Sequence, residues 1–156
     1  MPNPPSCDWK NPKKNSAKEK AGKSNCPDKL IRHKGKCRWQ GVKTDKYKTD
    51  ASHWSMVLRR VLIGDNGEKT KFHLRYFEIA PGGFTSLEYH KHSHVVVGIT
   101  GKGICLINNK KHKIGFLDTV YIGPNTVHNL QNPHDEPFGF FCIVDAKRDR
   151  PKIVKK

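Results

Sequence analysis

The sequence predicts an all-β domain, a barrel or sandwich of short strands, on three observations. Runs rich in β-branched and aromatic residues recur between residues 54 and 144, separated by Gly, Pro and Asn. No long segment there has the apolar periodicity of a helix. His90, His92 and His94 alternate with other residues, and His128 follows downstream. Because side chains two apart on a strand share a face, the alternation predicts three imidazoles pointing the same way.

The strands and turns follow in order along the chain. Asp65-Asn66-Gly67 predicts a hairpin after the first strand. Pro81-Gly82-Gly83 predicts a turn before the histidines, and Asn108-Asn109, which tolerates positive φ, predicts a second hairpin. Strands at this spacing are typical of a barrel or sandwich. The expected strands are residues 56–63, 71–80, 85–90, 94–100, 104–107, 111–114, 119–122, 127–131 and 138–144.

Charge and composition divide the chain into three parts. Residues 1–37 form an irregular, basic, Cys-containing arm, residues 38–146 form the barrel with an aromatic lead-in, and residues 147–156 form a basic tail. The net charge of +16 lies mostly at the two ends, with +9 in residues 1–50 and +5 in residues 147–156. The region between them carries only +2. A nearly neutral folded part argues against nucleic acid as a partner, because such modules have a basic face.

The sequence also bears on the cellular compartment. It has no apolar run near 18 residues, so no membrane span is expected, and its N-terminus lacks the apolar core of a signal peptide. Five cysteines in no tight framework favour reduced thiols and a cytoplasmic protein. Three of them lie in or beside the arm with one histidine and could bind a separate Zn²⁺, although the spacing lacks a Cys-x2-Cys knuckle. That set is Cys7, Cys26, His33 and Cys37.

The histidines lie in two motifs that resemble those of the cupin superfamily. His90-x-His92 with Gly103 downstream matches the first motif, and Asp118, the turn Gly123-Pro124-Asn125, His128 and Asn132 match the second. The position where cupins usually have a glutamate ligand is Val96. The resemblance implies a single-domain jelly-roll barrel that forms a homodimer.

Further stretches resemble a narrower group, the methylthio-xylulose phosphate methylsulfurylases. They are residues 74–79, Leu87-Glu88 before the histidines, residues 139–145 and Arg148-Asp149-Arg150-Pro151, within a resemblance covering residues 38–153. This implies cleavage of the carbon–sulfur bond of a methylthio sugar phosphate, giving deoxyxylulose phosphate. The methylthio group passes to a thiol such as glutathione. The implied cofactor is a divalent metal, Mn²⁺ first, with Fe²⁺, Ni²⁺ or Zn²⁺ as alternatives.

The residues themselves suit such chemistry. His90, His92 and His128 are expected metal ligands, and His94 is either a fourth ligand or an inward group beside them. Neutral imidazoles leave the metal its full charge, so it can stabilise the enolate that forms when sulfur leaves. Cys105, two residues after Gly103, is the predicted catalytic group that protonates the enolate carbon.

Several further residues are candidates for roles beside the metal. Cys142 is a second inward cysteine, but a buried cysteine is also an ordinary small apolar residue. Glu88 shares the strand face of His90 and could orient a ligand or move a proton. Arginine suits phosphate binding, and the sequence does not choose among five candidates. They are Arg59, Arg60, Arg75, Arg148 and Arg150.

Two other functions remain open at this point. A site with three histidines and no carboxylate is compatible with an iron dioxygenase, although the usual iron triad has two histidines and one carboxylate. A non-catalytic cupin could bind a small molecule or metal as a sensor and contact a partner through its basic arm. Metal analysis, oxygen uptake and turnover would separate the three functions.

Overall fold

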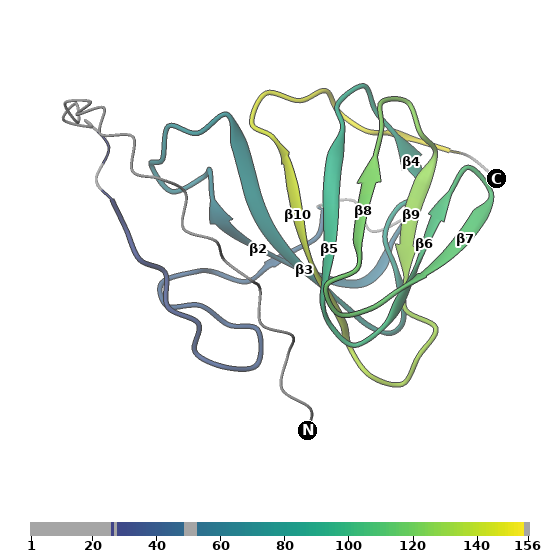
Figure 1. Cartoon of the computed structure of the whole chain (residues 1–156), viewed down its shortest axis with the longest axis horizontal. Coiled ribbons are helices and arrows are strands. Elements are labelled where there is room, and N and C mark those ends of the chain that lie inside the picture. Colours follow the sequence, from purple (N-terminus) through teal and green to yellow (C-terminus); the bar gives the residue numbers. More distant parts are fainter. Residues whose placement is uncertain (1–25, 27, 49–52, 155–156) are drawn as a thin grey trace, which may run out of the picture.

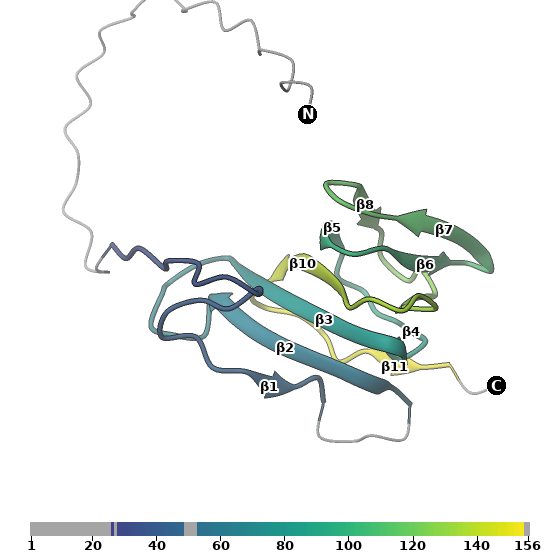
Figure 2. The same cartoon turned by 90° about the horizontal axis from the view of Figure 1, so that it is seen from below.

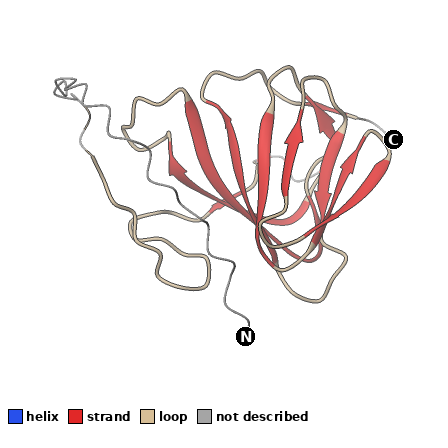
Figure 3. Ribbon diagram, in the orientation of Figure 1, coloured by secondary structure: helices blue, strands red, loops and turns tan. Residues whose placement is uncertain are grey.

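In the computed structural model, residues 26, 28–48 and 53–154 are described. Within these ranges the chain contains strands, turns and loops and no helix (Figure 3), so none of the described residues belongs to a helix that could cross a membrane. The all-β prediction is therefore confirmed. The strands are β1 Asp45–Lys46, β2 Ser55–Ile63, β3 Phe72–Phe84, β4 Glu88–Tyr89, β5 His94–Thr100, β6 Gly103–Ile107, β7 Lys110–Ile114, β8 Thr119–Ile122, β9 His128–Gln131, β10 Phe138–Asp145 and β11 Lys152–Ile153.

The strands form a cup. They run close together at one end and spread apart at the other (Figure 1), and a quarter turn shows two facing layers (Figure 2). All pairings are antiparallel, in the order β11-β4-β9-β3-β10-β5-β8. Outside this order, β2 pairs with β3 and β1, and the β6–β7 hairpin pairs with β9 through β6. This is the barrel that the spacing of turns predicts.

Strand β3 pairs with β2 and β10 and, at Phe84 beyond Pro81-Gly82-Gly83, also with β9. The predicted turn there is wrong, because β3 continues through these residues to Phe84. Gly82 has a φ of 76°, and the β2–β3 register shifts nearby. Such a glycine bulge bends a strand without ending it. Within the bulge, the backbone N–H of Gly82 donates to the carbonyl of Asn132, and the N–H of Asn132 donates to the carbonyl of Gly83. Because Asn132 directly follows β9, these hydrogen bonds connect β3 to the strand that carries His128.

The core fills the closed end of the cup. It includes Ile79 and Ile122, which are fully buried, and three phenylalanines. The Phe140 ring stacks on that of Phe77 and meets that of Phe138 at a tilt. Alternate residues of β3, β10 and β5 point inward, which places Arg75, Cys142 and Val96 in one row across three strands. Burial of Val96 explains why a core aliphatic residue occupies the usual glutamate position.

The aromatic lead-in divides between two faces. Tyr47 packs on Trp54 and Phe77 near the mouth of the cup. Trp39 instead packs on Tyr76 and Phe141, which alternate with the inward residues of their strands and so lie on the other face of the sheet. The described residues that follow β10, predicted as a basic tail, return to the barrel, where β11 pairs with β4.

Candidate metal centre

The histidine segment lies between two strands, as the expected strands 85–90 and 94–100 imply, so the strand alternation used to place its three imidazoles on one face does not apply. Strand β4 ends at Tyr89 and β5 begins at His94, so His90 and His92 lie in the bend between them. The backbone N–H of Asn125 donates to the carbonyl of His90 at 2.7 Å, which holds this bend against the loop before β9. The bend turns the side chains of His90 and His94 toward one point, which a straight strand would not do.

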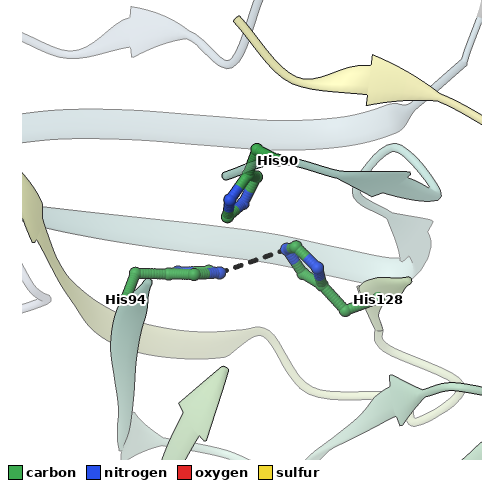
Figure 4. Close-up of side chains that lie close together, drawn as sticks. All are labelled: His90, His94 and His128. Carbon is green, nitrogen blue, oxygen red and sulfur yellow. Dashed lines mark hydrogen bonds between the residues drawn. The ribbon is translucent and has the colours of Figure 1, made fainter. Parts of the chain in front are cut away.

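Three of the predicted histidines converge at this point. The ligating nitrogens of His90, His94 and His128 all lie within 4.8 Å of one another (Figure 4). His90 and His128 are 4% and 3% exposed, and His94 is 9% exposed. They come from the bend, the start of β5 and the start of β9, and so from two separate parts of the chain. Among the described residues, this is the one group of three or more His, Cys, Asp or Glu side chains placed to hold a metal ion.

Hydrogen bonds determine which nitrogen each ring presents. His90 Nδ1 lies 2.7 Å from the carbonyl of His92, and His128 Nδ1 lies 2.8 Å from the carbonyl of Thr126. A carbonyl only accepts, so each Nδ1 carries the proton and donates it. Each Nε2 is therefore left with a lone pair, as a metal requires, and anchoring the other ring nitrogen is the usual arrangement around metal-binding histidines. His94 Nδ1 lies 3.3 Å from Cys142 Sγ, and because a thiol can donate as well as accept, either ring nitrogen of His94 can carry the proton.

The facing nitrogens of His94 and His128 are placed to share either a proton, as a hydrogen bond from His94 to His128, or a metal ion. His94 Nε2 and His128 Nε2 are 3.1 Å apart (Figure 4). If both Nδ1 atoms are protonated, two lone pairs face each other, and a positive ion would relieve this repulsion. Burial lowers the pKa of His90 and of His128, and burial together with the neighbouring histidines lowers the pKa of His94 to about 2. The rings are therefore neutral at physiological pH and fit a divalent metal.

His92 lies beside this group rather than within it. Its ring stacks on that of His90, with centroids 3.7 Å apart and planes 3° from parallel. Its Nδ1 is 2.7 Å from Asp149 Oδ1, so its Nε2 also carries the free lone pair. His92 lines the same cavity as the other three histidines. Its role as a further ligand remains a prediction.

The histidines lie in a cavity of about 170 Å³. Pockets for drug-sized ligands usually measure about 300–1,000 Å³, so this one suits a smaller molecule. Phe77, Leu130 and Phe140 supply an apolar wall. Glu88 also lines the cavity and pairs with Lys48, whose Nζ also lies 3.1 Å from Ser86 Oγ.

The two inward cysteines differ in depth. Cys105 is fully buried in the core opposite Leu130, and Leu130 rather than Cys105 lines the cavity. Burial raises the pKa of the Cys105 thiol to about 11. Cys142 does line the cavity, and its Sγ lies 3.2 Å from Arg75 Nη2 as well as near His94. A cysteine beside a guanidinium has the electropositive surroundings of a reactive thiol.

The predicted zinc site in the arm lies partly outside the described residues, because Cys7 belongs to the residues that are not described. Cys26 lies 3.6 Å from the carbonyl of Gly67, the ring of His33 packs on Trp39, and Cys37 contacts the Tyr76 side chain. These three do not form a metal-binding group in the described part of the chain.

Two site residues escaped prediction. Lys48 lies in the lead-in, and nothing in its local sequence marks it. Asp149 accepts hydrogen bonds from the backbone N–H of Lys91 at 2.9 Å and of His92 at 3.2 Å, in addition to its contact with the His92 ring. These hydrogen bonds hold the pKa of Asp149 well below its usual range. The sequence does distinguish Asp149 from its neighbours, because it is the one acid among residues 147–156.

Comparison with known proteins agrees with this geometry. The cupin domain model matches residues 75–144. The 1-methylthio-D-xylulose 5-phosphate methylsulfurylase of Rhodospirillum rubrum is 38% identical over 117 residues, 74% of each protein. A solved cupin-2 domain of R. rubrum is 36% identical with a TM-score of 0.70, and the match covers 76% of this chain and 79% of that one. A cupin 2 conserved barrel protein of Rhodopseudomonas palustris is 34% identical with a TM-score of 0.75, covering 81% and 87%.

The motifs, the barrel and these similarities agree with one another. Identity of this level over three quarters of both chains extends well beyond the histidine motifs. The chain therefore belongs to the cupin family and is a relative of 1-methylthio-D-xylulose 5-phosphate methylsulfurylase.

Proposed function

We propose that the protein is a metal-dependent enzyme that cleaves the carbon–sulfur bond of a methylthio-xylulose phosphate and transfers the methylthio group to a thiol such as glutathione. The observation that carries this proposal is the imidazole cluster inside a small cavity, in a chain related to a methylsulfurylase. The atoms balance without an outside oxidant or reductant. The thiol sulfur forms a bond to the methylthio sulfur, the carbon–sulfur bond breaks, and its electron pair stays on carbon, which takes a proton.

A divalent metal fits the donor set. His90, His94 and His128 would hold it, and His92 stands beside them as the predicted further ligand. When bound, such an ion would act as a Lewis acid that stabilises negative charge developing on the substrate oxygens. We infer Mn²⁺ first, because the resemblance implies it, with Fe²⁺, Ni²⁺ and Zn²⁺ as alternatives that metal analysis separates.

The chain's own residues supply orientation and protons. The apolar wall of Phe77, Leu130 and Phe140 excludes water from the reacting carbon and suits a methylthio group. A cysteine thiol is the proposed proton donor to that carbon. Cys105 is the prediction from sequence, while the cavity lining and the contacts with His94 and Arg75 favour Cys142. In either case the thiol acts as general acid on the enolate carbon.

We further infer a cytoplasmic homodimer. Cys37, Cys105 and Cys142 are free thiols, which suits a reducing compartment. Exposed sheet edges are commonly covered by pairing with a second copy. A groove of about 870 Å³ on the barrel, lined by Phe84, Leu87 and Leu106 among others, provides apolar surface for it. Light scattering after gel filtration should give twice the chain mass, and a monomer mass would contradict the inference.

The decisive experiment uses metal-loaded protein with methylthio-xylulose phosphate and glutathione. Deoxyxylulose phosphate should appear together with the mixed methyl disulfide of glutathione, and chelation of the metal should stop both. The control is His112→Gln, a change of an exposed histidine on β7, which should leave turnover unchanged. Absence of both products under anaerobic conditions with each candidate metal would contradict the proposal. Oxygen uptake with an iron-loaded sample would favour a dioxygenase instead.

A further inference from the structure

Three arginines face the same cavity as the histidines. Arg59 comes from β2, Arg75 from β3 and Arg148 from the segment after β10, and all three line it. The β2–β3 register places Val61 opposite Arg75 and Phe77 opposite Arg59, so the two arginines are diagonal neighbours on one face. Diagonal neighbours lie within reach of each other when their side chains are long. Three cations therefore gather in a cavity that also holds three buried neutral imidazoles.

These cations lack a close carboxylate partner within the described ranges, although Arg148 Nη1 donates to the backbone carbonyls of Asp145 at 3.0 Å and Ala146 at 3.3 Å. Among the described residues, neither Arg75 nor Arg148 forms a salt bridge, and Arg59 has only a contact of 4.0 Å with Asp45. The Nε–H groups of Arg59 and Arg75 are buried, and no described residue accepts a hydrogen bond from them. Buried donors are normally paired, and leaving one unpaired costs about 1–3 kcal/mol. An acceptor-rich anion in the cavity would satisfy these donors and separate the charges.

The other cations of the region are already paired or lie elsewhere. Lys48 contacts Glu88 inside the cavity. Arg60 faces the opposite side of the sheet, where its Nε donates to Thr44 Oγ1 at 3.0 Å and its guanidinium lies over the Tyr76 ring. Arg150 lines a neighbouring groove rather than the histidine cavity. The structure thus separates the five candidate arginines into three that face the cavity and two that do not.

We propose that Arg59, Arg75 and Arg148 form a subsite for a phosphate monoester dianion, joined to the metal centre through Cys142. The identification of that phosphate as part of the substrate rests on the proposed function. Arginine suits this ligand because its planar guanidinium donates two parallel hydrogen bonds to phosphate oxygens. Partial burial, and then the charge of Arg75, lower the pKa of Arg148, while Asp65 acts in the opposite direction, which agrees with neighbouring like charges that an anion would stabilise.

The connection through Cys142 orients a ligand. Its Sγ lies 3.2 Å from Arg75 Nη2 and 3.3 Å from His94 Nδ1, so the thiol stands between the arginines and the imidazoles. A sugar phosphate held by the arginines would thus have its carbon chain directed past Cys142 toward the histidines. This would place the phosphate at one end of the cavity and the reacting carbon at the other.

The test measures binding of inorganic phosphate to the metal-loaded protein at constant ionic strength, by calorimetry. Arg59→Gln, Arg75→Gln and Arg148→Gln should each weaken it about 10- to 100-fold, since a hydrogen bond to a charged group contributes about 1.5–3 kcal/mol. Arg150→Gln is the matched control, close in sequence and equal in charge, and should bind as the wild type does. Arg148 is exposed, so its variant should fold even if Arg75→Gln does not.

Two outcomes would overturn the subsite. One is a wild-type protein that does not bind phosphate. The other is a set of variants that bind it as tightly as the wild type, which would place the anion elsewhere. Kinetic measurements distinguish a failure of the subsite from a failure of the proposed function. Phosphate binding that follows the predicted pattern without turnover of methylthio-xylulose phosphate would leave the subsite standing alone. Turnover with an unchanged KM in all three variants would remove the subsite and leave the activity.

Discussion

Asp149 illustrates how one side chain can determine the state of a metal site. It accepts from two backbone N–H groups of the histidine bend and from the ring of His92. The first two bonds hold the bend in place, and the third keeps the proton on Nδ1. A carboxylate 57 positions away in the sequence thereby selects the tautomer that a metal requires.

We therefore predict that Asp149→Ala weakens metal binding about 10- to 100-fold, the usual cost of removing such a partner. Asp149→Asn should recover part of the loss, because its amide oxygen still accepts hydrogen bonds. Competition with a fluorescent chelator measures the affinity. Asp135→Asn, at an exposed turn, serves as the control. Equal affinity in the wild type and Asp149→Ala would show that the bend keeps its shape without the carboxylate.

The two inward cysteines can be separated by a pair of serine variants. If Cys142 is the proton donor, Cys142→Ser should lower kcat strongly with little change in KM, because an alcohol is a far weaker acid than a thiol. Cys105→Ser would bury a hydroxyl in the core and should reduce the free energy of unfolding, by about 1–3 kcal/mol, with little effect on kcat. The reverse pattern in kcat would support Cys105, the residue predicted from sequence. Urea unfolding of both variants distinguishes lost activity from lost folding.

Among the elements, β5 carries His94 and depends on a close backbone approach. A Cβ at Gly98 would lie 1.9 Å from the carbonyl oxygen of Gly115, and backbone bonds of Gly98 with Leu117 and Asp118 close the same contact. Only a residue without a side chain allows this approach. The position of β5, and with it His94, therefore depends on one glycine.

Gly98→Ala should reduce the free energy of unfolding by about 1–3 kcal/mol or more, the usual cost of forcing atoms into a packed region. Gly115→Ala is the matched control, because its nearest neighbour would be 3.8 Å from the new Cβ. Urea midpoints of the apoproteins compare them. If both substitutions cost the same, the close approach is not what constrains β5.

Local sequence predicted some elements well and others only in part, for physical reasons. Asn108 and Asn109 have φ values of 44° and 68°, so the predicted hairpin is confirmed, since the turn depends on these two residues alone. Pro81-Gly82-Gly83 was misassigned because a turn and a glycine bulge use the same residues. What distinguishes them is the pairing with Asn132, a contact between distant parts of the chain.

Across the whole chain, the sequence predicted the identity of the site residues better than their arrangement in space. His90, His92 and His128 were the expected ligands and His94 was left open, whereas the structure brings together His90, His94 and His128. Cys105 does point inward, but an inward position does not show how far a side chain lies from the cavity. Long-range pairs such as His92 with Asp149 depend on the completed fold, so no local pattern reveals them.

The buried histidines make the stability of the metal-free protein depend on pH. The pKa of His90, His94 and His128 is lowered in the folded state, whereas the unfolded chain takes up protons at the ordinary pKa near 6.5. Below that pH the unfolded state binds more protons, so the free energy of unfolding falls as pH falls. The slope is at most about 1.4 kcal/mol per pH unit for each histidine. The loss continues for His94 down to its folded pKa of about 2.

Urea unfolding of the apoprotein between pH 7.5 and 5 would measure this slope. His94→Gln should flatten it by removing one of the titrating groups, while His112→Gln on the exposed face of β7 should leave it unchanged. The carboxylates titrate mostly below this window, so they contribute little. An identical slope in the wild type and His94→Gln would show that His94 keeps its proton on folding.

The segment that carries Arg148 and Asp149 also couples the metal site to the pairing of the strand that follows it. Strand β11 pairs with β4, directly before the histidine bend. Loss of that pairing would release Asp149 from the bend and Arg148 from the cavity together. Proteolytic cleavage between β10 and β11 is therefore expected to weaken metal retention before it unfolds the barrel.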